Sequence, residues 1–244
     1  MDGIDLIIGG RVAHVVLNRP KSRNAFDSKM LAAYEDAMTV LDREREVEVV
    51  VLRAEGPSFC SGTDLKELEN FDADDTLHWQ RRASAMVERW ARLVATTVTA
   101  YNGPAIGSGA VIGLASDVRL AADTSSFTFP EVDFGMPLTW SGIPILTMLL
   151  GADRAKRLLL FSETLDAAEL KRLDLVMEVV TEAELETATG RIVDQLLAAP
   201  LISRSMTKRA VLAAAAAPGF TTNLHEPFLA SLSIYDSNAN GKGV

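Results

Sequence analysis

The sequence is short of several features, and each shortage excludes a class of protein. Cys60 is the only cysteine among 244 residues, so no disulfide forms within the chain, and a reducing cytoplasm fits this composition. Lysine and arginine number 24 against 33 aspartates and glutamates, and the net charge of −9 argues against nucleic acid and anionic membranes as partners. No apolar run approaches the length of a transmembrane helix. We therefore expect a soluble cytoplasmic protein.

What is present is typical of a large globular domain. Hydrophobic residues make up 48% of the chain and charged residues 23%, which supports a substantial core. Two apolar runs around Gly9 and Gly10 predict an N-terminal β-hairpin, and residues 47–53 predict a strand buried on both faces. Asp27 is positioned to cap a helix that ends near residue 42. This mixture of strands and helices predicts an α/β fold.

The most informative stretch is residues 100–111. It follows an apolar run at residues 93–98 that predicts a buried strand, and it turns through three glycines into a predicted helix over residues 110–115. A glycine-rich turn at the start of a helix lets the backbone approach a ligand and directs free N–H groups at it. Such a place favours negative charge, either a phosphate or a developing oxyanion. A tight connection without a ligand is the alternative.

The same glycines also permit a dinucleotide-binding interpretation. Gly107 and Gly109 open a strand–turn–helix, but the fingerprint requires a glycine or alanine at position 112, where Ile112 stands. Gly113 comes one position too late, and the predicted helix is short for a nucleotide-binding crossover. A dinucleotide-binding oxidoreductase therefore stays as the alternative from a different functional class.

Two further features have a functional and a structural interpretation. The loop at residues 18–25 carries Arg19, Lys21 and Arg23, which fit either a polyphosphate contact or a solvated turn. Glu131 stands among apolar and aromatic neighbours, and burial there would raise the pKa of its carboxyl. Neither feature alone decides the function.

Two turns of the same kind, at residues 61–64 and 107–109, stand in an ordered series of motifs that resembles the crotonase (enoyl-CoA hydratase/isomerase) superfamily. The resemblance covers almost the whole chain. The motifs are Leu17-Asn18-Arg19-Pro20, Asn24-Ala25, Val50-Val51-Leu52, Phe59-Cys60-Ser61-Gly62-Thr63-Asp64-Leu65-Lys66-Glu67, Asn102-Gly103, Gly107-Ser108-Gly109, Pro130-Glu131-Val132 with Gly135, and Leu165-Asp166-Ala167-Ala168-Glu169.

The resemblance implies an architecture. It predicts repeated ββα units of the ClpP/crotonase fold over residues 1–185, which hold the acyl-CoA site. It also predicts a C-terminal helical region over residues 186–244 that serves oligomer assembly, as a homotrimer or a dimer of trimers.

The resemblance also implies the ligand and its contacts. The ligand is an acyl-coenzyme A thioester, with coenzyme A entering as part of the substrate and with no separate cofactor or metal. The backbone N–H groups of Thr63 and Ser108 match the two donors of the family's oxyanion hole, which would favour the enolate formed when the α-carbon loses a proton. Lys21, Arg23 and Lys66 fall where the family binds coenzyme A.

The carboxylates separate the possible reactions. Hydratases of the family use two glutamates, and here the first position is Val111 and the second Glu131. One glutamate suffices to move a proton between carbons, so the resemblance favours a Δ3-Δ2-enoyl-CoA isomerase of fatty acid metabolism. An enoyl-CoA hydratase and a non-catalytic acyl-CoA binder stay as alternatives. Asp64 and Asp133 are further candidate acids, and the family pattern indicates a structural role for Asp64.

The residues after Glu131 depart from the family pattern. Leu138 and Trp140 replace the small residues often found there. Together with Val111, they are predicted to shape the acyl pocket and to narrow it or block a water site.

Overall fold

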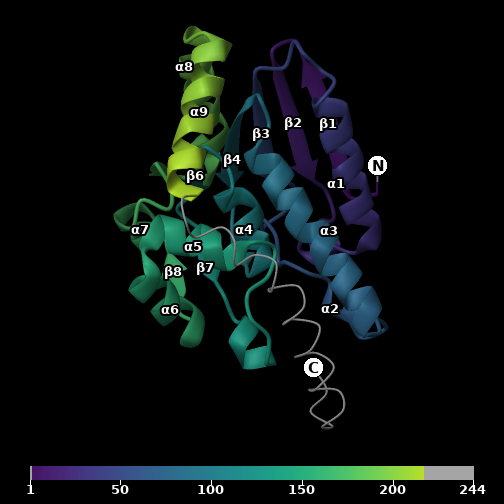
Figure 1. The fold of residues 1–244 in the computed structure, drawn as a ribbon. Helices are drawn as coiled ribbons and strands as arrows, with labels where there is room; N and C mark the ends of the chain where they lie inside the picture. The colour runs from purple at the N-terminus through teal and green to yellow at the C-terminus, as the bar shows by residue number, and fades with distance from the viewer. Residues whose placement is uncertain (1, 217–244) are drawn as a thin grey trace.

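The computed structural model describes residues 2–216 and is built on a six-stranded sheet with the order β1-β2-β3-β4-β6-β9 (Figure 1). β1 and β2 form the predicted antiparallel hairpin, and the remaining neighbours pair in parallel. The strands are β1 (Ile4–Gly9), β2 (Val12–Leu17), β3 (Val49–Ala54), β4 (Thr96–Tyr101), β6 (Val118–Ala122) and β9 (Glu178–Val180).

A second sheet of three short strands lies beside the carboxyl ends of the first. Its order is β5-β7-β8, with β5 parallel to β7 and β7 antiparallel to β8. These strands are β5 (Ala105–Ile106), β7 (Ser126–Thr128) and β8 (Thr164–Asp166).

Helices follow the strands along the chain. The α-helices are α1 (Ser28–Leu41), α2 (Leu65–Leu68), α3 (Ala73–Ala91), α4 (Ser108–Leu114), α5 (Gly142–Leu150), α6 (Ala152–Leu160), α7 (Ala167–Arg172), α8 (Leu185–Ala198) and α9 (Leu201–Ala216). The 3-10 helices are η1 (Pro20–Ser22), η2 (Glu131–Phe134) and η3 (Glu182–Glu184). The predicted cap of α1 is confirmed, because the Met30 N–H donates to Asp27 Oδ1 at 2.8 Å.

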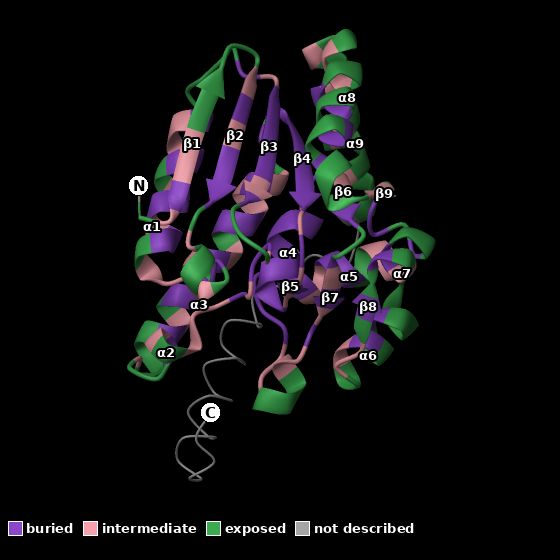
Figure 2. Ribbon diagram, turned by 180° about the vertical axis from the view of Figure 1, so that it is seen from behind, coloured by how far each residue is buried: buried purple, intermediate pink, exposed green. Residues whose placement is uncertain are grey.

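The core explains why β3 is a nearly continuous apolar run. Successive side chains of a strand point to opposite faces of the sheet. Val50 and Leu52 belong to the large core cluster that includes α1 and α3, whereas Val49 and Val51 pack in a second cluster with Ile192 of α8. Figure 2 shows β2, β3 and β4 buried along most of their length. Helices therefore cover both faces of this strand, as the sequence predicted.

Two predicted boundaries need correction. The strand predicted over residues 93–98 is β4, Thr96–Tyr101, because α3 continues to Ala91 and Leu93 extends its buried apolar face through the following turn. Thr96 and Thr97 of β4 interrupt the apolar run at residues 93–98 from which the strand was predicted. The helix predicted over residues 110–115 is α4 and begins at Ser108, so the glycine turn leads directly into its first residue.

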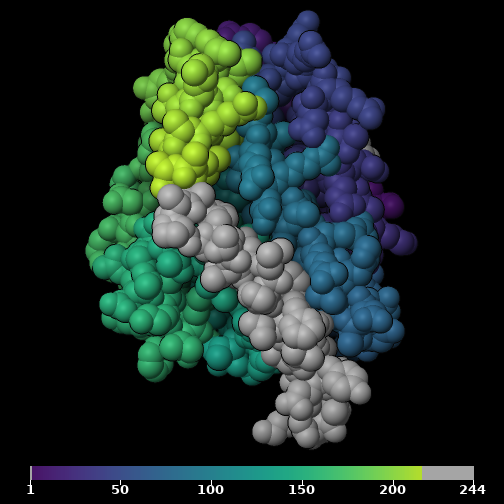
Figure 3. Space-filling model, viewed as in Figure 1, coloured from purple at the N-terminus to yellow at the C-terminus, as the bar shows by residue number. Residues whose placement is uncertain are grey.

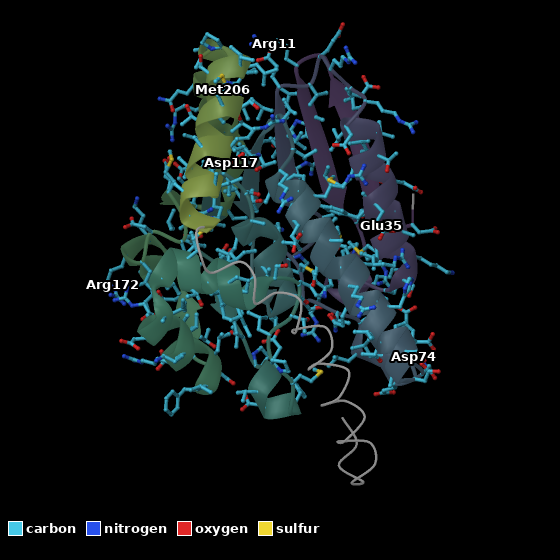
Figure 4. All side chains as sticks on the ribbon, in the orientation of Figure 1. Arg11, Glu35, Asp74, Asp117, Arg172 and Met206 are labelled. Carbon is cyan, nitrogen blue, oxygen red and sulfur yellow. The ribbon has the colours of Figure 1, made fainter. Side chains whose placement is uncertain are left out.

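The last described helix, α9, is held against the body of the molecule by two ion pairs. Arg204 Nη2 lies 2.6 Å from Glu48 Oε2, and Lys208 Nζ lies 2.7 Å from Asp117 Oδ2, with Asp117 beside the helix in Figure 4. Figure 3 shows α9, in yellow, packed directly against the blue-green segments next to it. Its other face leaves Ile202, Met206 and Val211 exposed.

Residues 2–216 contain neither a membrane-spanning helix nor a cluster of metal ligands. No helix among them is both long enough and apolar enough to span a bilayer. No group of three or more histidines, cysteines, aspartates or glutamates in this part of the chain is arranged to hold a metal ion.

Candidate active site

The two glycine turns identified in the sequence meet in space. The Ile106 N–H donates to the Cys60 carbonyl oxygen at 2.9 Å. This bond joins β5, which precedes the turn at residues 107–109, to the segment that precedes the turn at residues 61–64. A Cβ on Gly62, whose φ is 86°, would lie 2.9 Å from the Ile106 oxygen, and one on Gly109 would lie 2.3 Å from the Cys60 oxygen. Both positions therefore require glycine, because any side chain would drive the turns apart.

Each turn presents one backbone N–H to the same cavity. The N–H groups on either side of Thr63 are used, since the Gly62 N–H donates to Cys60 Sγ at 3.4 Å and the Asp64 N–H donates to the Phe26 oxygen at 2.8 Å. The Thr63 N–H itself has no hydrogen-bond partner among residues 2–216. Ser108 is the first residue of α4, so its N–H has no partner within the helix. The two predicted oxyanion donors thus lie in the walls of one cavity.

This cavity has a volume of about 80 Å³ and a wall that is mainly apolar. Its lining residues are Ser61, Gly62, Thr63, Leu65, Leu68, Gln80, Ile106, Gly107, Ser108, Pro130, Glu131, Phe134, Met136, Pro137 and Thr139. Among these described lining residues, Glu131 is the only one with an ionisable side chain. A mainly apolar pocket with a few convergent polar groups is typical of a small-molecule site.

Glu131 lies at the start of η2 with its carboxyl group against the start of α4. A Cβ on Gly107, whose φ is 54°, would come within 2.0 Å of Glu131 Oε1, so the glycine makes room for the carboxyl. Burial raises the pKa of Glu131 to about 7, although hydrogen bonds from the N–H groups of Glu131 itself and Ser108 act to lower it. Its Oε2 atom is buried without a hydrogen-bond partner. A carboxyl with this pKa can both take and return a proton near neutral pH.

The other candidate acids are not placed for this chemistry. Asp64 forms an ion pair with Arg19 at 3.6 Å, and the same guanidinium lies 3.0 Å from Asp27. Asp64 therefore has a structural role, because this ion pair holds the turn at residues 61–64 in place. Asp133 is exposed on η2 and is absent from the lining of the cavity.

The three residues predicted to shape the acyl pocket lie deeper than its wall. Val111, Leu138 and Trp140 are each at most 3% exposed, and none of them lines the cavity. Val111 and Leu138 pack around Gly142, where a Cβ would lie 2.8 Å from Val111 Cγ2 and 2.5 Å from a Leu138 methyl carbon. The wall itself comes from neighbouring residues such as Met136 and Thr139. Direct contact of the three with an acyl chain stays a prediction.

Trp140 fixes the turn that carries this wall. Trp140 and Ser141 have φ values of 58° and 62°, a left-handed conformation that costs roughly 1–2 kcal/mol per non-glycine residue. The indole of Trp140 lies edge-on to Phe26 at 5.2 Å between ring centroids and 5.4 Å from the ring of Trp79 on α3. Ser141 Oγ donates to Glu88 Oε1, also on α3, at 3.3 Å. Packing on α3 therefore stabilises a strained turn.

Gln80 is a polar lining residue that the sequence interpretation missed. It is 2% exposed on α3, and its Oε1 has no hydrogen-bond partner in the described part of the chain. An unpaired buried amide oxygen costs about 1–3 kcal/mol. Gln80 follows Trp79 on the buried stripe of α3 that continues to Ala83. A polar residue at an apolar helix position is a signal that could have been found in the sequence.

The predicted coenzyme A contacts lie next to the cavity. The Ser61 N–H donates to the Arg23 oxygen at 2.9 Å, which places the cationic loop against a lining residue. Lys66 follows the lining residue Leu65. Lys21, Arg23 and Lys66 are exposed, and their side chains form no ion pair with any other residue in the range 2–216. Three unpaired cations beside the cavity suit the phosphates of a nucleotide-containing ligand.

Comparison with known proteins identifies this arrangement. The model of the family described as enoyl-CoA hydratase/isomerase matches residues 8–226. The chain belongs to this family. The resemblance to crotonases seen in the sequence is thereby confirmed, and the protein is an enzyme of the crotonase type.

The relatives are named for more than one reaction. An enoyl-CoA isomerase/hydratase of Mycosarcoma maydis is 32% identical over 80% of this chain and 74% of its own. A probable enoyl-CoA hydratase of Mycobacterium bovis is 30% identical over 93% of this chain and 86% of its own. A solved structure of a probable enoyl-CoA hydratase from Mycobacterium smegmatis has a TM-score of 0.88 at 27% identity and covers 100% of this chain and 99% of that chain. Membership therefore leaves hydration and isomerisation to be separated by the site.

Proposed function

We propose that the protein is a Δ3-Δ2-enoyl-CoA isomerase that uses Glu131 as its single acid–base group. The observation that carries this proposal is the cavity, in which Glu131 is the only ionisable residue among the described lining residues and lies beside two backbone N–H donors. The site thus combines one proton carrier with a place for one developing negative charge.

The proton movement balances with these groups alone. The Glu131 carboxylate removes a proton from C2 of a 3-enoyl thioester, and the electrons spread over C2, C4 and the thioester oxygen as a dienolate. The N–H groups of Thr63 and Ser108 stabilise the charge on that oxygen. The carboxyl then returns its proton to C4, which leaves the double bond between C2 and C3. A pKa of about 7 serves both steps, because neither proton transfer is strongly uphill.

The described residues that line the cavity include no second carboxylate of the kind that a hydratase uses. Addition of water requires one group to activate the water and another to protonate carbon. The corresponding residue, Val111, is fully buried and lies outside the cavity wall. Hydration is the second candidate, because several relatives are named as hydratases.

Binding and assembly complete the proposal. Lys21, Arg23 and Lys66 hold the phosphates of coenzyme A at the rim of the cavity. The apolar residues exposed on α9, Ile202 and Met206, support assembly into a homotrimer or a dimer of trimers in the cytoplasm. A monomer in light scattering at micromolar concentration would contradict this assembly.

The deciding experiment identifies products. The protein is incubated separately with 3-enoyl-CoA and 2-enoyl-CoA, and the thioesters are separated by chromatography and mass spectrometry. The proposal expects interconversion of the two without gain of water. Formation of 3-hydroxyacyl-CoA as the main product would assign hydration instead, and binding without turnover would assign a non-catalytic acyl-CoA binder.

A further inference from the structure

Two buried polar atoms in the cavity lining lack a hydrogen-bond partner among the described residues. One is Glu131 Oε2, which the proposed reaction uses as the proton carrier. The other is Gln80 Oε1, which the reaction leaves without a task. Native proteins seldom leave such an atom unpaired, so each one calls for an explanation, such as a role in catalysis or a bound water or ion.

The packing around Gln80 gives no structural reason for an amide. Most of the residues that line the cavity with it are apolar or glycine, among them Leu65, Leu68 and Met136. Its Oε1 atom forms no hydrogen bond with any residue from 2 to 216. A methionine has nearly the same length and would fill the position without an unpaired polar group. The amide is therefore better explained by what enters the cavity.

The chemistry of the amide restricts that occupant. An amide has an acceptor oxygen and a donor NH₂ side by side, and without a protein partner either orientation is available. A hydroxyl group both donates and accepts, so it satisfies either orientation. A ketone would leave the amide oxygen unpaired, and a carboxylate would add a second negative charge beside Glu131, where no described lining residue carries a positive one.

We propose that Gln80 recognises a hydroxyl group on the acyl chain, so that this enzyme prefers hydroxylated acyl-CoA thioesters to plain ones of the same length. The proposal rests on the proposed acyl-CoA function. It makes Gln80 a specificity residue that contacts the substrate away from the reacting carbons. Residues 61–63 and 107–108 hold the thioester, and Gln80 on α3 selects the chain.

The test uses saturated thioesters, so that binding is measured without turnover. Hexanoyl-CoA is compared with 4-, 5- and 6-hydroxyhexanoyl-CoA by calorimetry on the wild-type protein, Gln80→Met and Leu68→Met. We expect at least one hydroxylated ester to bind the wild type about tenfold more tightly than hexanoyl-CoA. Gln80→Met should remove this preference, whereas Leu68→Met, which changes the same wall without changing its polarity, should keep it.

The outcomes separate this inference from the proposed function. Equal affinity of the wild type for all four esters would overturn the role of Gln80 while leaving acyl-CoA binding intact, and the amide would then hold a water molecule. A preference that survives in Gln80→Met would overturn it as well. Failure of every ester to bind, including hexanoyl-CoA, would instead overturn the acyl-CoA function and this inference with it.

Discussion

The two glycine turns at the cavity each present one backbone N–H donor, but the two donors differ in whether a protein group already uses them. The Thr63 N–H has no partner among residues 2–216, whereas the Ser108 N–H is directed to the Glu131 carboxyl. Both turns depend on glycines with positive φ, Gly62 and Gly107, but only the second turn has the carboxyl packed against it. The first donor is thus available to a ligand, and the second is shared between the ligand and the base.

Because the Ser108 N–H serves both the ligand and Glu131, substrate binding affects the pKa of Glu131. When a thioester oxygen takes the Ser108 N–H, the Glu131 carboxylate loses a hydrogen bond that favours its charged form. Loss of such a bond raises the pKa of a carboxyl group. Substrate binding is therefore expected to make Glu131 a stronger base at the moment when it is needed.

The largest effect is expected from Glu131→Gln. Glutamine keeps the shape and a hydrogen-bonding oxygen but cannot carry the proton, so isomerisation should fall by about 10²–10⁴ while affinity for the thioester changes little. Steady-state kinetics and calorimetry measure the two quantities. An unchanged rate in this variant would show that Glu131 is not the acid–base group.

The next effect concerns the shared donor. Ser108→Pro removes the N–H at the first position of α4, where proline is otherwise accepted, and should reduce kcat by about 10²–10³. Ser108→Ala is the matched control, because it removes the hydroxyl and keeps the N–H. Equal activity of the proline variant and the wild type would exclude the Ser108 N–H as an oxyanion donor.

The state of Glu131 also sets the pH dependence of activity. The carboxylate form is required for proton removal, so kcat/KM should fall by about tenfold per pH unit below the pKa of about 7 and level off above it. A profile measured between pH 5 and 9 locates this transition. A flat profile across this range would contradict the raised pKa.

The same group makes stability depend on pH, with a definite sign. The pKa of Glu131 is raised from 4.5 to about 7 on folding, so the folded state binds the proton more tightly than the unfolded chain. This contribution is fully present below pH 4.5 and is lost as the pH rises through 7, a change of about 3 kcal/mol. Glu131→Gln should therefore unfold at a higher temperature than wild type at pH 8, and the difference should shrink toward pH 4.5. Thermal unfolding of both proteins across this range tests it.

The sequence predicted the two turns better than what surrounds them. Gly62 and Gly107 follow from steric rules that act locally, and the raised pKa of Glu131 was anticipated from its apolar neighbours in the chain. The depth of Val111 and Trp140 was not predictable, because it depends on how α4, α5 and α3 pack together. The position of Gln80 on the apolar stripe of α3 could be seen in the sequence, but its role could not. Gln80 reaches the cavity from a helix distant in the sequence, and only packing shows that its amide is buried and unpaired.

The smallest effect is expected from the side chains of the two donor residues. Thr63 Oγ1 and Ser108 Oγ lie 3.4 Å apart, so both hydroxyls stand near the donors without being the donors themselves. Thr63→Ala and Ser108→Gly keep both N–H groups, and we expect kcat/KM to fall by less than about tenfold in each, the size of one neutral hydrogen bond. Thr63→Ser serves as the control that keeps the hydroxyl. A loss of about 10² or more in Ser108→Gly, with binding intact, would mean that the hydroxyl supplies the hydrogen bond assigned here to the backbone. The turn at residues 107–109 would then donate through a side-chain hydroxyl, and the turn at residues 61–64 through a backbone N–H.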